Sequence, residues 1–93
     1  MDSSTQFTLM EGKFNREDAT SIVLNFFNTK IMYHNQQLLR MGEQGNNDHA
    51  PIDRKISELN QTKQAIINFL AQMNDEGQTV EIEGAIRMKM SGK

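Results

Sequence analysis

The sequence predicts an α+β fold in the order β-α-α-β, in which a long antiparallel helical hairpin packs on a two-stranded antiparallel sheet. Two segments with helical spacing of apolar residues lie on either side of a glycine-rich turn, and a strand with period-two alternation follows them. A shorter alternating segment precedes them. We expect residues 6–90 to form a single domain between a flexible N-terminus, residues 1–5, and a flexible tail, residues 91–93.

The first strand and the first helix follow each other closely. Apolar positions alternate over residues 6–10, which predicts a short strand. Asn15 suits a helix N-cap because its side chain can accept a hydrogen bond from the backbone N–H near Asp18. We expect this helix to run to Met41 and to be terminated by Gly42.

The apolar residues of the first helix occupy an arc of about 200° when they are projected at about 100° per residue. One partner helix covers a narrower stripe, so this helix is expected to face both its hairpin partner and a sheet or a second subunit. The arc contains Ala19, Ile22, Val23, Leu24, Phe26, Phe27, Ile31, Tyr33, His34, Leu38 and Met41.

The second helix follows a turn-rich segment at 42–48 and is expected to begin near Pro51, whose missing N–H costs nothing in a first helical turn. Its apolar residues step by four and three in alternation, which is the spacing of a helix that lies along another. Lys63 is the polar exception, Ile67 and Phe69 broaden the stripe near its end, and Gly77 is expected to cap the helix. The seam comprises Ile52, Ile56, Leu59, Lys63, Ile66, Leu70 and Met73.

The last strand is the clearest element of the chain. Between Thr79 and Met90 apolar and polar residues alternate with period two. The helical hairpin returns the chain to the end of the first strand. The two strands are therefore expected to pair antiparallel, with their apolar faces on the helices.

Composition narrows the function classes. The chain has 93 residues and no cysteine, so neither disulfides nor thiolate metal sites can stabilise it, which favours the cytoplasm. Its 12 acidic residues outnumber 10 Lys and Arg, and the signs are interspersed, which makes nucleic acid an unlikely partner. The first residues lack the pattern of a secretory signal, and no window approaches 18 apolar residues, so no membrane partner is expected.

Candidate chemistry is sparse, and we expect no catalytic, cofactor or metal site and no enzyme. His34 lies in the apolar arc, where a buried imidazole can act as a base or a metal ligand, but we interpret it as a packed side chain that is hydrogen-bonded to a neighbour. It remains a weak ligand-site candidate. Asp48, His49 and Asp53 are metal-compatible residues near the start of the second helix, a pattern more typical of a capped helix end.

Several stretches resemble a family of short bacterial proteins of unknown function. They are Glu11-Gly12-Lys13-Phe14, Tyr33-His34, Asp48-His49 and the strand from Val80 to Met90. The resemblance covers most of the chain and implies a bacterial, cytoplasmic protein without implying an activity.

Three functions remain open. The first is a non-enzymatic interaction or structural module that acts as a homodimer and possibly contacts another protein, for which Met32 and Leu39 would offer an exposed patch. The second is a small-ligand-binding protein or enzyme with a pocket near His34, between the first helix and the sheet. The third is a dimeric nucleic-acid-binding regulator with a basic surface formed by Lys13, Arg16, Arg40, Arg54 and Lys55.

The last strand suggests how two copies would associate. It is about twice as long as the predicted first strand and would leave an exposed edge in a monomer. If two copies pair antiparallel about a two-fold axis through Ala85, Glu81 faces Lys89, Glu83 faces Arg87, and the sheet has four strands. The hypothetical dimer interface is Glu81, Ile82, Glu83, Gly84, Ala85, Ile86, Arg87, Met88 and Lys89.

Overall fold

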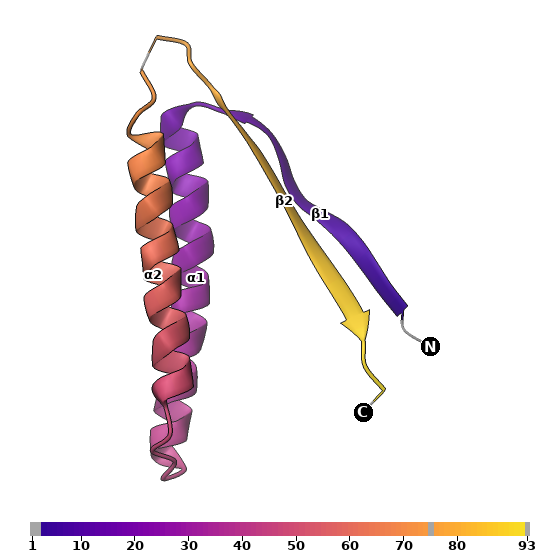
Figure 1. Cartoon of the computed structure of the whole chain (residues 1–93), viewed down its shortest axis with the longest axis vertical. Helices are drawn as coiled ribbons and strands as arrows, with labels where there is room; N and C mark the ends of the chain where they lie inside the picture. Colours follow the sequence, from indigo (N-terminus) through magenta and orange to yellow (C-terminus); the bar gives the residue numbers. More distant parts are fainter. Residues whose placement is uncertain (1–2, 75, 93) are drawn as a thin grey trace.

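The computed structural model describes residues 3–74 and 76–92 and contains the four elements in the predicted order. The α-helices α1 (Arg16–Glu43) and α2 (Ala50–Leu70) form an antiparallel hairpin, and β1 (Ser3–Phe14) pairs antiparallel with β2 (Val80–Met90), as Figure 1 shows. The α+β fold and the element order are therefore confirmed. Residues 1, 2 and 93, which we assigned to flexible ends, lie outside the described residues.

Strand β1 is longer than predicted. It spans Ser3–Phe14, 12 residues against 11 in β2, and residues 3–5 lie within it rather than in a flexible end. The pairing shifts by one residue between Thr8, opposite Ala85, and Met10, opposite Gly84, as in a β-bulge. Before the bulge the odd-numbered residues of β1 lie on the face that carries Phe7. After the bulge the even-numbered residues do, so Phe14 lies on the same face as Phe7.

The observed cap of α1 agrees with the predicted one at the N-terminal end only. The side chain of Asn15 accepts from the backbone N–H of Asp18 at 2.8 Å, as predicted. At the other end Gly42 lies inside the helix, and the prediction that it ends the helix is wrong. Gly45 has φ +74 and donates to Gly42 O at 3.1 Å, while the next N–H donates to Met41 O at 2.8 Å. These two bonds form a Schellman motif, whose left-handed position suits glycine.

Helix α2 lies on α1 through the predicted seam. The seven seam residues from Ile52 to Met73 are all half-buried or buried. Lys63 keeps its stem in the seam and donates from Nζ to Asn28 Oδ1 of α1 at 3.0 Å. Of the two residues predicted to broaden the seam, Ile67 is half-buried, whereas Phe69 is 60% exposed and does not broaden it. The helix ends at Leu70, so Gly77, with φ +77, lies in the following loop and is not its cap.

The hairpin and the sheet meet at one end only, which we call the vertex. Here Ala19, Leu70 and Met73 form a buried cluster. Partly buried residues from the strands and α2 pack against it, namely Phe14, Ile66, Val80 and Ile82.

Beyond the vertex, the two strands run away from the helices, as Figure 1 shows. The molecule is thin, with extents of 53 × 35 × 15 Å. The expectation that the strands place their apolar faces on the helices is therefore correct only near the vertex. We call the paired strands β1 and β2 the ribbon.

Candidate functional site

The ribbon has a mainly apolar and a polar face, and at its tip Thr5 and Ser3 pair with Met88 and Met90 on the mainly apolar face. Cross-strand pairs place Phe14 with Val80, and Phe7 with Ile86, on the apolar face. Met10 and Gly12 join this face because of the bulge, and sequence analysis missed them although residues 10, 12 and 14 alternate in phase with each other. The polar pairs are Lys13 with Glu81, Glu11 with Glu83, Thr8 with Ala85, Gln6 with Arg87 and Ser4 with Lys89.

The apolar face is covered at the vertex and uncovered at the tip of the ribbon. Val80, Ile82 and Ile86 are half-buried, whereas Met88 is 58% and Met90 is 82% exposed. On β1, Phe7 and Leu9 are also exposed. The outer half of the ribbon thus presents large apolar side chains to solvent.

A groove separates the ribbon from α1. Its volume is about 270 Å³, and its walls are almost entirely apolar. Phe26 is exposed here, and Tyr33 is exposed further along α1. The wide arc of α1 therefore faces α2 on one side and this partly open groove on the other. The groove is lined by Leu9, Met10, Ile22, Val23, Phe26, Phe27, Ile66, Ile82, Glu83, Gly84 and Ala85.

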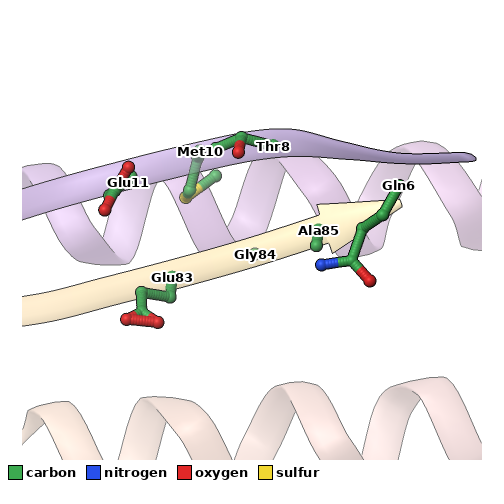
Figure 2. A pocket seen from close by; sticks show the side chains of 7 residues that line it. All are labelled: Gln6, Thr8, Met10, Glu11, Glu83, Gly84 and Ala85. Atoms are coloured by element: carbon green, nitrogen blue, oxygen red, sulfur yellow. The ribbon is translucent and has the colours of Figure 1, made fainter. Parts of the chain in front are cut away.

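The polar face carries a shallow pocket of about 350 Å³ at the middle of the ribbon, shown in Figure 2. Glu11 and Glu83 are directly paired across the two strands, and like charges in that position destabilise a sheet. Gly84 and Ala85 leave the centre of β2 nearly bare of side chains (Figure 2). The surface of β2 is therefore nearly free of side chains at this point. It lies beside two negative charges, those of Glu11 and Glu83, which face each other.

His34 is packed between the helices and not beside the sheet. It is 9% exposed, and its Nδ1 lies 2.6 Å from Gln37 Oε1. It lines a surface depression of about 410 Å³ between α1 and α2 with Lys30, Lys55 and Glu58. The ligand hypothesis placed its pocket between the first helix and the sheet, and this placement is wrong. The cause is distance, because His34 lies about 22 Å along α1 from Ala19 at the vertex, where the ribbon has left the helices.

The residues near the start of α2 do not assemble into a metal site. His49 Nδ1 lies 2.8 Å from Asp53 Oδ2, and both side chains are about half exposed. The backbone N–H of Asp48 donates to Asn46 Oδ1 at 3.0 Å. Across residues 3–74 and 76–92, no three His, Asp or Glu side chains are grouped so that they could hold a metal ion.

The five residues of the nucleic-acid hypothesis form two separate groups. Lys13 and Arg16 lie near the vertex, and Arg16 Nη1 donates to the carbonyl of Met73 at 3.2 Å. The other three lie at the far end of the hairpin, one helix length or about 40 Å away. Those three are Arg40, Arg54 and Lys55.

No protein-family model, curated protein or solved structure matches this chain. Neither helix in the described ranges is long and apolar enough to cross a membrane.

Proposed function

We propose that this chain is a non-enzymatic interaction or structural module that acts as a homodimer. The observation that carries the proposal is its excess surface. A compact monomer of 10.7 kDa exposes about 5,500 Å² according to the scaling of folded proteins with mass, whereas this chain exposes 7503 Å². The excess is about 2,000 Å² per copy, which matches what one subunit of an obligate homodimer buries.

The core is correspondingly small. Among apolar residues in the described part of the chain, Ala19, Leu70 and Met73 are the ones that are buried. A two-stranded ribbon is at best marginally stable in water unless its apolar face is covered, and here the outer half is uncovered. A second copy would supply that cover.

The exposed apolar side chains also lie where one partner could reach them together. Leu9 of the ribbon and Phe26 of α1 line opposite walls of the groove, and the tip residue Met88 continues the apolar face beyond it. Contiguous apolar surface of this kind is typical of protein–protein interfaces. By contrast, the five basic residues of the nucleic-acid hypothesis are divided between the vertex and the far end of the hairpin, and the depression at His34 contains Glu58 beside two lysines.

The experiment that tests this function is sedimentation equilibrium over a hundred-fold range of protein concentration. We expect a mass of twice the 10.7 kDa of one chain, and a thermal midpoint that rises with concentration because association stabilises the folded state. A cooperatively folded species with the mass of one chain at every concentration would contradict the proposal.

A further inference from the structure

We infer that the two copies join through the edges of β2, antiparallel about a two-fold axis through Ala85, to make a four-stranded sheet ordered β1-β2-β2-β1. This inference rests on the proposed homodimer and specifies its interface. In it, residues of the two copies face each other when their numbers sum to 170.

The choice of edge follows from the bulge. The two strands are almost equally long, so the prediction that the last strand is about twice as long as the first is wrong. Both strands have an outer edge, but the edge of β1 is interrupted between Thr8 and Met10. Bulges discourage strand pairing, whereas β2 pairs with β1 through 11 successive residues and presents a regular edge.

The charges on the polar face agree with this register. Glu83 faces Glu11 within one copy, and the two-fold axis places Arg87 of the other copy on the opposite side of Glu83. Glu81 similarly lies between Lys13 of its own copy and Lys89 of the other. Both acidic residues of β2 thereby face a basic residue across the axis.

Other symmetric registers are poorer. Moving the axis to residue 84 or 86 leaves only one kind of oppositely charged pair, because either Glu83 or Arg87 then faces Ala85. A slip that makes the sum odd sets the apolar face of one strand against the polar face of the other. The register through Ala85 avoids both faults.

The proposed pairing accounts for the exposed apolar side chains at the tip of the ribbon in a single copy. Across the axis Met90 faces Val80, and Met88 faces Ile82, so the most exposed end of each ribbon lies beside the vertex of the other copy. Gly84 faces Ile86 and leaves room for its side chain. The helices of each copy would then cover the tip that the other copy leaves open.

The register can be read with single cysteines, because the chain contains none of its own. Ala85→Cys should form an intermolecular disulfide on mild oxidation, since directly opposed Cα atoms lie about 5 Å apart. Glu83→Cys and Arg87→Cys should not cross-link alone, because each lies about 14 Å from its own copy across the axis. Mixing these two variants should produce the cross-linked species.

A charge exchange supplies an independent measurement. Arg87→Glu should raise the dimer Kd about ten-fold, because both symmetric pairs become repulsive, and adding Glu83→Arg should restore it. Arg54→Glu, the same charge change at the far end of the hairpin, is the matched control and should leave Kd within about two-fold.

The outcomes separate the inference from the proposed function. A monomer at all concentrations would overturn both. A stable dimer in which Ala85→Cys stays reduced, or cross-links no better than Glu83→Cys, would overturn the interface while leaving the homodimer intact. Circular dichroism should show unchanged helix content in each variant, so that a raised Kd reports the loss of the interface and not the loss of the fold.

Discussion

Replacing Leu70 with alanine measures how much the vertex contributes to stability. Leu70 is 3% exposed and packs with Ala19 and Met73, where α1, α2 and the ribbon meet. The substitution removes three buried carbon atoms, which is worth about 2.4 kcal/mol of transfer free energy at about 0.8 kcal/mol each. The cavity left among Phe14, Val80 and the helices raises the expected loss to about 3–4 kcal/mol.

The measurement is urea unfolding followed by circular dichroism at one fixed protein concentration, because the stability of a dimer depends on concentration. Leu70→Met conserves volume and should lose less than about 1.5 kcal/mol. Leu39→Ala makes the same deletion at a side chain that is 70% exposed, and should change stability by no more than about 0.5 kcal/mol.

The losses of stability in Leu70→Ala and Leu39→Ala together test whether the vertex is the core of the fold. If Leu70→Ala loses less than about 1 kcal/mol, the vertex is not the core of the fold. If Leu70→Ala loses the expected value of about 3–4 kcal/mol (about 2.4 kcal/mol of transfer free energy plus the cavity) and Leu39→Ala loses as much, the side chain of Leu39 is covered by a partner in solution.

The remaining predictions concern helix ends and the buried histidine. Gly45→Ala should lose about 1 kcal/mol because its φ of +74 disfavours a Cβ, whereas Gly42→Ala, inside α1 with open space around it, should gain about 0.5–1 kcal/mol; thermal unfolding compares the two. Asn15→Ala should lose about 1 kcal/mol with its cap bond, and Asn15→Ser should retain most of that in the same assay. His34→Gln should lose about 1–3 kcal/mol in urea unfolding as a core change does, and added Zn²⁺ should not shift the thermal midpoint of the unaltered protein.

Each of these predictions can be contradicted by a specific result. Equal effects at Gly42 and Gly45 would contradict the Schellman motif, and an unchanged midpoint for Asn15→Ala would show that the cap bond contributes nothing. A midpoint raised by Zn²⁺ and abolished by His34→Gln would make His34 a ligand and not a packing residue.

Local patterns in the sequence determined the helical seam, the N-cap and the last strand. The spacing from Ile52 to Met73 reports burial directly, because residues three and four apart lie on one face of a helix. The side chain of Asn15 meets a backbone N–H only three residues away. The alternation from Val80 onward needs no knowledge of the partner strand. The charges on β2 also predict a dimer register, which stays a prediction.

Only the tertiary structure decided the length of β1, the end of α1, the position of His34 and the divergence of the ribbon. The bulge in β1 depends on pairing with Ala85 and Gly84, more than 70 residues away in the chain. Either Gly42 or Gly45 could end α1 as far as the sequence shows. The helix ends before Gly45 because Gly45 is the one that adopts a positive φ. The groove between α1 and the ribbon arises because only the vertex carries enough buried apolar surface to hold the two layers together, and that balance depends on all four elements at once.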